Sequence, residues 1–124
     1  MELQLLPQPF AVCQVTNLQQ INWQMPFCFL SKTDEELSLV CPEENLPTQT
    51  LQCEYGWRTF KICGTLDFAL VGILARLSGL LAAAGISIFA VSTYNTDYIL
   101  IKETALEQAS AILTTNGYNI ITAI

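Results

Sequence analysis

Polar side chains gather in one short loop near the C-terminus. Residues 92–97 (STYNTD) separate two apolar runs and carry hydroxyl, amide and carboxylate groups. Ser92, Thr93, Asn95 and Thr96 can hydrogen-bond a small molecule, and the lone acid Asp97 can pair with an ammonium or guanidinium group. The loop therefore predicts a site for a polar ligand. An ordinary polar hairpin, in which Asp97 bonds the turn backbone, accounts for the same residues.

A complementary anion site is predicted at the start of a helix. Asp67 is placed to cap a helix whose first turn contains the amides of Leu70, Val71 and Gly72. Such amides lack a partner within the helix and favour a carboxylate. Gly72 has no Cβ, so a ligand or a neighbouring backbone can approach it closely. Packing of the helix explains this glycine equally well.

The composition excludes several kinds of chemistry. The 124 residues contain no histidine, which removes Ser-His-Asp and Cys-His nucleophile pairs and Cys₂His₂ zinc sites. Lys and Arg number 5 and Asp and Glu number 11, so the net charge is −6 and few cations are available to neutralise phosphates. We expect no enzyme activity, no cofactor, no metal and no nucleic-acid partner.

The cysteines show no spacing typical of a metal site. There are 5 of them, an odd number, and no two are arranged as CxxC: Cys13, Cys28, Cys41, Cys53 and Cys63. We expect free, buried thiols in a reducing compartment. Only Cys63, close to Lys61, has a nearby cation that could favour its thiolate.

The longest apolar stretch, Phe68–Val91, is long enough to raise the question of a membrane span. Arg76 lies in its middle, and its character changes at Gly85 from Leu- and Ala-rich to β-branched. A helix to about Ala84 followed by a buried strand explains the stretch better. Because the N-terminus carries Glu2 and no basic segment, we also expect no signal peptide, and a cytoplasmic protein without membrane contact.

Residues 57–124 show a regular succession of elements. We expect strands at 57–63, 86–91, 98–101 and 118–121, with a helix over 68–84 and a second helix that ends at Gly117. Thr104 and Glu107 have the spacing of a capping box for that second helix. The order βαββαβ is a ferredoxin-like α+β arrangement. Right-handed crossovers then place both helices on one face of a four-stranded antiparallel sheet.

Residues 1–56 are β-rich and leave no room for a full helix. Strands are expected at 10–15, 26–31 and 37–41, and Pro7 and Pro9 favour a position at an edge or just outside the sheet for the first of them. The hairpin over residues 29–41 echoes the one over 90–102 about 60 positions later, which indicates an internal repeat. We therefore predict a degenerate unit at 1–56 and a complete unit at 57–124.

The run from Leu70 to Ile101 resembles an ACT domain. The block GISIFAVSTYNTDYILIKE, at residues 85–103, is most similar to the arginine-sensor-like (CASTOR-type) ACT domains, which include small bacterial proteins with two ACT units. Residues 37–43 and 56–58 also resemble those bacterial proteins. The resemblance implies the βαββαβ fold, side-by-side pairing of ACT units, and a regulatory role in which a free amino acid binds at the pairing interface. It also implies that Asp97 contacts the ligand.

Two functions are consistent with these features. The first is a homodimeric regulatory protein that senses a free amino acid of unknown identity at an ACT–ACT interface and acts on a protein partner. Its site would consist of Leu70, Val71, Gly72, Ser92, Thr93, Asn95 and Asp97. The second is a structural or protein-interaction module that dimerises without binding a metabolite. The hydrophobic content of 52% fits either, because paired units need apolar contact surface.

Overall fold

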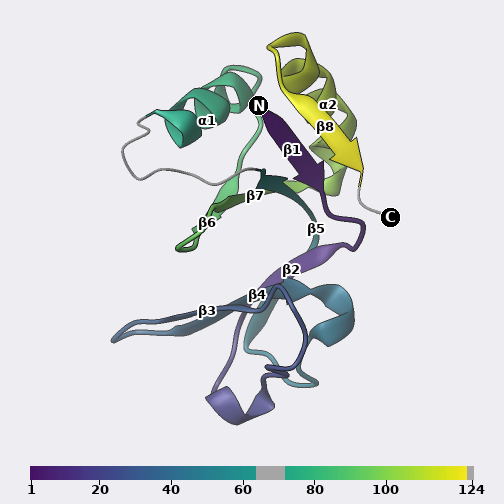
Figure 1. Cartoon of the computed structure of the whole chain (residues 1–124). Coiled ribbons are helices and arrows are strands. Elements are labelled where there is room, and N and C mark those ends of the chain that lie inside the picture. Colours follow the sequence, from purple (N-terminus) through teal and green to yellow (C-terminus); the bar gives the residue numbers. More distant parts are fainter. Residues whose placement is uncertain (64–71, 123–124) are drawn as a thin grey trace. The chain divides into compact units, whose positions relative to one another are not determined.

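The computed structural model describes residues 1–63 and 72–122, and the chain divides into two compact units. The helical unit comprises Met1–Pro7 and Arg58–Ile124, and the β unit comprises Gln8–Trp57. The long strand β5, Gln52–Ile62, contributes residues to both units (Figure 1). Among the described residues, no helix is long and apolar enough to cross a membrane.

The helical unit has the predicted βαββαβ order and one strand more. After β5 come α1 (Ile73–Ala83), β6 (Phe89–Ser92), β7 (Asp97–Lys102), α2 (Leu106–Thr115) and β8 (Asn119–Thr122). The additional strand is β1, Glu2–Leu5. In this unit the strands pair in the order β8-β1-β5-β7-β6.

The strand β1 corrects the expected four-stranded antiparallel sheet. It lies between β5 and β8, antiparallel to the first and parallel to the second. Leu3 is fully buried and stands opposite both Ile62 and Ile120, so burial of an apolar side chain accounts for the insertion. Nothing in residues 1–9 was predicted to form a strand.

Both helices pack on the same face of this sheet, as predicted. One core cluster contains Phe60 and Ile62 of β5, residues of β1 and β7, and the inner faces of α1 and α2. From the helices it takes these fully buried side chains: Leu77, Leu81, Ala109 and Leu113. In each helix the two residues lie four positions apart, which places them on one helical face.

The helices end as predicted but begin differently. Gly85 and Gly117 have φ angles of 76° and 94°, and each terminates its helix in the left-handed conformation that glycine adopts without a steric penalty. Helix α1 begins at Ile73 instead of near residue 68, because Gly72 has a φ of 83° and cannot continue a helix. Residues 68–71 and the predicted cap Asp67 lie outside the described residues.

The predicted capping box before α2 does not form. Thr104 lies inside a 3₁₀ turn, Glu103–Ala105 (η3), that leads directly into α2. The residue before α2 is Ala105, and no side chain caps the helix. The preceding turn supplies local bonding instead, since the N–H of Leu106 donates to the carbonyl oxygen of Glu103.

The β unit is described throughout and contains no α-helix. Its strands are β2 (Phe10–Gln14), β3 (Phe29–Lys32), β4 (Leu37–Pro42) and the first part of β5, in the order β3-β4-β2-β5. All three pairings are antiparallel. Short 3₁₀ turns lie at Leu18–Gln20 (η1) and Glu43–Asn45 (η2).

The edge position expected for the first of these strands is wrong. Strand β2 pairs on both sides, with β4 and with β5. Pro7 and Pro9 precede Phe10, so neither proline removes an N–H donor from the paired residues of β2.

The internal repeat is confirmed at an offset of 60 positions. Phe29 pairs with Val40 in the β3–β4 hairpin, and Phe89 pairs with Leu100 in the β6–β7 hairpin. Each hairpin has a threonine after its first strand, and the N–H of that threonine donates across the turn at 2.9 Å. A 3₁₀ turn follows each hairpin, at 43–45 and 103–105.

Candidate ligand-binding site

The loop between β6 and β7 is a tight hairpin turn closed by a threonine. The N–H and the hydroxyl of Thr93 both donate to the carbonyl oxygen of Thr96 at 2.9 Å, and the N–H of Thr96 donates back to the Thr93 hydroxyl oxygen at 3.3 Å. Thr93 is exposed, yet its hydroxyl already serves the turn. Its predicted role toward a ligand therefore competes with a structural one.

Thr96 anchors this hairpin and is not open to a ligand, which corrects the expectation that its hydroxyl belongs to the exposed polar groups. Its side chain is 4% exposed, and its hydroxyl donates to the carbonyl oxygen of Ile62 at 2.6 Å. Ile62 ends β5, so the bond ties the hairpin to the strand that leads toward α1. Its neighbours in the sequence, Asn95 and Asp97, are polar and give no sign that Thr96 is buried.

Three of the predicted polar groups surround this anchored turn. Ser92 ends β6 and stands directly opposite Asp97, the first residue of β7. Ser92 and Asn95 are exposed, and Asp97 is partly exposed. Their hydroxyl, amide and carboxylate groups therefore lie close together and open to solvent, so they can hydrogen-bond a polar ligand.

The start of α1 offers amide donors, but at residues later than predicted. The N–H of Arg76 makes the first helical bond, to Gly72 at 2.8 Å. The amides of residues 73–75 therefore occupy the first turn, where helical amides lack a partner within the helix. Gly72 caps this turn without a side chain, and the turn contains no acid. Leu70 and Val71 lie outside the described residues.

Gly72 is explained by its backbone rather than by a close neighbour. A Cβ built there meets no described atom within 4 Å. The φ of 83° is the feature that requires glycine, because other L-residues avoid this region. Neither close approach of a neighbouring backbone nor helix packing is therefore needed to account for the residue within this chain.

The outer face of α1 is apolar and exposed. A shallow groove of about 660 Å³ runs along it and along the following loop, lined by small residues that include Ala75, Gly79 and Ala82. Ile88, just before β6, also lines the groove, and in the described part of the chain β6 pairs only with β7. This face of α1 is a surface on which another protein surface can pack.

Comparison with known proteins identifies the architecture. A family model described as an ACT domain matches residues 52–115, more than half of the chain. The chain belongs to the ACT-domain family. A second model, of an N-terminal domain, matches residues 8–49 of this ACT protein. No curated protein matches its sequence.

Solved structures extend the likeness to nearly the whole ACT protein. A structural-genomics protein from Agobacterium tumefaciens is 26% identical, with a TM-score of 0.88 over 99% of this chain and 93% of the other. A Vibrio cholerae protein of unknown function, described as a possible transport protein, is 20% identical with a TM-score of 0.71 over 92% and 88%. Aspartokinase alpha and beta subunits are 14% identical with a TM-score of 0.63 over 93% and 96%. The last two likenesses show the fold.

Arg76 has its partners within the helical unit of the ACT protein. Its guanidinium donates to the carbonyl oxygen of Asn116 at 3.0 Å and lies 5.2 Å from the centre of the Tyr118 ring. These contacts join α1 to the end of α2 and account for an arginine in an otherwise apolar stretch.

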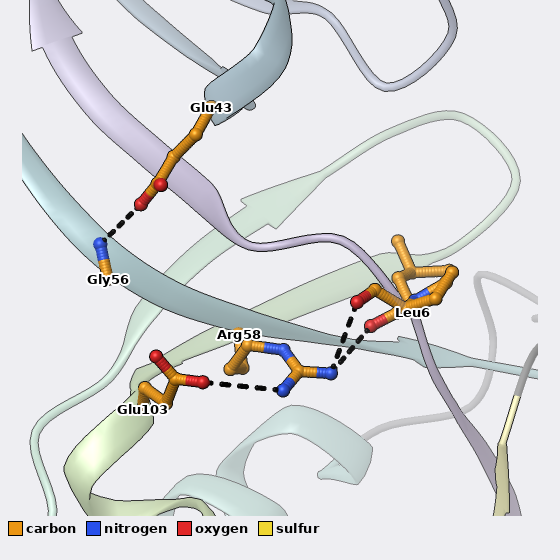
Figure 2. Close-up of polar contacts among 6 residues, drawn as sticks. Leu6, Glu43, Gly56, Arg58 and Glu103 are labelled. Atoms are coloured by element: carbon orange, nitrogen blue, oxygen red, sulfur yellow. Dashed lines mark hydrogen bonds and ion pairs between the residues drawn. The ribbon is translucent and has the colours of Figure 1, made fainter.

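Glu43 and Glu103, which begin the 3₁₀ turns η2 and η3, have structural roles as well. In the β unit, Glu43 accepts a bond from the N–H of Gly56 at 2.7 Å. In the helical unit, Glu103 forms a 3.8 Å ion pair with Arg58, which also donates to the carbonyl oxygens of Leu6 and Pro7 (Figure 2). Each glutamate thus connects its turn to β5. Among residues 1–63 and 72–122, no group of His, Cys, Asp or Glu is arranged to hold a metal ion.

Proposed function

We propose that this ACT protein is a cytoplasmic regulatory protein that binds a free amino acid where two ACT units pair. The observation that carries the proposal is the anchored hairpin after β6, which presents Ser92, Asn95 and Asp97 to solvent. The ACT family match and the fold shared with aspartokinase subunits support a regulatory role rather than a catalytic one. The CASTOR-type resemblance of residues 85–103 favours an amino acid as the ligand.

An amino acid carries charges that suit the two halves of this site. Its carboxylate would bind amides at the start of α1, in the segment from Leu70 and Val71 through Gly72 and the first helical turn. A cationic group would pair with Asp97, and Ser92, Thr93 and Asn95 would hydrogen-bond the remaining polar atoms. A hydrogen bond to a charged group contributes about 1.5–3 kcal/mol, so loss of the Asp97 charge should weaken binding strongly.

A thermal-shift screen with the common amino acids tests this proposal. An amino acid that binds only the folded protein, at a hundredfold its dissociation constant, should stabilise it by about 2.7 kcal/mol. The variant Asp97→Asn should lose this shift. Asp34→Asn is a matched control, because Asp34 is an exposed acid in the loop of the corresponding β3–β4 hairpin. If no amino acid at millimolar concentration moves the unfolding temperature, amino-acid sensing is wrong.

The exposed outer face of α1 favours a second candidate function, a module that dimerises without binding a metabolite. Both candidates require a homodimer, and the exposed apolar groove makes this face the contact that we propose for it. Ala82→Glu puts a charge into the groove and should shift light scattering from dimer toward the 13.7 kDa monomer. A wild-type dimer without any amino-acid response would favour the module. A wild-type monomer would contradict pairing in both candidates.

A further inference from the structure

Four of the five cysteines meet in the core of the β unit. Cys13 and Cys41 are 4% and 1% exposed and belong to the buried cluster, and Cys28 and Cys53 pack against it from partly exposed positions. The four residues come from different parts of the unit, so their spacing in the sequence predicted no cluster. All are free thiols in the structure.

The register of the sheet singles out one pair of these thiols. Cys13 on β2 stands directly opposite Cys53 on β5. Directly opposed residues of antiparallel strands have Cα atoms about 4.5–5.5 Å apart, which falls within the range of about 4.4–6.8 Å that disulfides need. Cys41 stands opposite Ala11, so it has no cysteine as its cross-strand partner.

We propose that Cys13 and Cys53 are an oxidation site, at which a hydroperoxide converts the two thiols into a cross-strand disulfide. Because the two residues stand directly opposite each other, their side chains are neighbours on the same face of the sheet. Cys53 is the partly exposed member of the pair and Cys13 the buried one. The oxidant therefore reaches Cys53 first, and Cys13 completes the bond.

The reaction balances with hydrogen peroxide as the only oxidant. The Cys53 sulfur attacks one peroxide oxygen, the O–O bond breaks, and one water leaves as Cys53 becomes a sulfenic acid. The Cys13 sulfur then attacks the Cys53 sulfur, the S–O bond breaks, and the hydroxide takes up the Cys13 proton to leave as a second water. Two thiols are oxidised by two electrons and one peroxide is reduced to two waters.

Burial controls the second step. Desolvation, and to a smaller extent the neighbouring Cys53, raises the pKa of Cys13 to about 11. At neutral pH this thiol stays protonated and is a weak nucleophile, so closure of the disulfide should accelerate as the pH rises from 7 toward 10. The closed bond would link the first strand of the β unit to its last and close a covalent loop of residues 13–53, which contains the β3–β4 hairpin.

Mass spectrometry of the full chain tests the proposal. Wild-type protein is treated with hydrogen peroxide, unfolded in the presence of an alkylating reagent and digested. We expect a mass loss of two hydrogens, a linked peptide joining Cys13 to Cys53, and an unfolding midpoint in urea that rises after oxidation and returns after reduction. Cys53→Ser should abolish both the linked peptide and the rise in midpoint.

Cys63→Ser is the matched control. Cys63 is also partly exposed, but it belongs to the helical unit, where its thiol donates to the carbonyl oxygen of Lys61 at 3.7 Å. This variant should form the disulfide as the wild type does. A linked peptide between any other two cysteines, or oxidation of folded protein that stops at sulfinic acid without a Cys13–Cys53 link, overturns the proposal. Because Cys53 is partly exposed, Cys53→Ser should keep its fold, which circular dichroism can verify.

Discussion

The hairpins β3–β4 and β6–β7 share their register and turn, but the chain leaves them in different ways. After β7, the 3₁₀ turn η3 runs directly into α2, and Leu106 has helical angles of φ −60° and ψ −45°. After β4, the turn η2 ends at Leu46, which is extended at φ −63° and ψ 140°. The residue after Leu46 is Pro47, and the residue after Leu106 is Glu107. A proline disfavours the helical region for the residue before it, so Pro47 explains why Leu46 is extended and does not begin a helix.

The comparison teaches that a repeated hairpin does not require a repeated domain. The β unit retains the strands and the 3₁₀ turn of the helical unit, and it buries its own smaller apolar cluster. The helical unit adds two helices, whose inner residues fill a larger core. The loops of the two hairpins also differ, because Glu36 in the β unit stands at the position of Thr96 in the helical unit.

The largest effect is expected in the core of the helical unit. Leu113 of α2 is fully buried, so Leu113→Ala should lower the free energy of unfolding by about 2–5 kcal/mol. All of the α-helix described lies in the helical unit, whereas Trp23 and Trp57 both belong to the β unit. Helical circular dichroism and tryptophan fluorescence in a urea titration therefore report on different units.

Leu39→Ala is the counterpart in the β unit, because Leu39 is 1% exposed in its core. We expect Leu113→Ala to shift mainly the circular-dichroism transition and Leu39→Ala to shift mainly the fluorescence transition. Equal shifts of both signals in both variants would mean that the two units unfold as one. The comparison of separate cores would then be wrong as a description of stability.

The second prediction tests the proline explanation itself. Glu107→Pro should drive Leu106 toward the extended conformation that Leu46 adopts, and it should destabilise the helical unit by about 1–3 kcal/mol. Helical circular dichroism should fall. The reverse change, Pro47→Glu, should add no helix, because residues 46–56 lack apolar side chains at helical spacing and residues 52–56 form a strand. A gain of helix in Pro47→Glu would show that the proline alone suppresses a helix.

Much of this fold could be predicted from the sequence, namely the features that depend on residues close together in the chain. Period-two strands and the glycine stops at Gly85 and Gly117 depend on neighbouring residues, and they were predicted correctly. Strand β1 and the pairing of β2 on both sides depend on distant partners, and they were missed. The polar loop of the candidate site was recognisable by its residue types. Thr96 was not recognised as its anchor, because its burial depends on Ile62, far away in the chain.

The third prediction concerns the position at which the hairpins differ most. Thr96→Val removes the hydroxyl that bonds Ile62 and leaves a buried carbonyl oxygen without that donor, which should cost about 1–3 kcal/mol. Glu36 holds the corresponding place in the β3–β4 hairpin and is exposed, so Glu36→Val should change stability by less than about 0.5 kcal/mol. Denaturation midpoints would measure both. Equal losses in the two variants would contradict a special role for Thr96.

The smallest effect separates the two glutamates that connect the 3₁₀ turns to β5. Glu43 accepts a 2.7 Å bond from a backbone N–H, and an amide in its place would accept the same bond without the charge. Since charged acceptors contribute roughly 1 kcal/mol more than neutral ones, Glu43→Gln should lose about that amount.

Glu103 meets Arg58 at 3.8 Å, and its side chain is 62% exposed. Water and salt screen such a pair, so Glu103→Gln should cost about 0–0.5 kcal/mol, and added salt should remove that cost. If Glu103→Gln costs more than Glu43→Gln, the ion pair contributes more to its unit than its exposed position indicates, and the order of these two contacts is reversed.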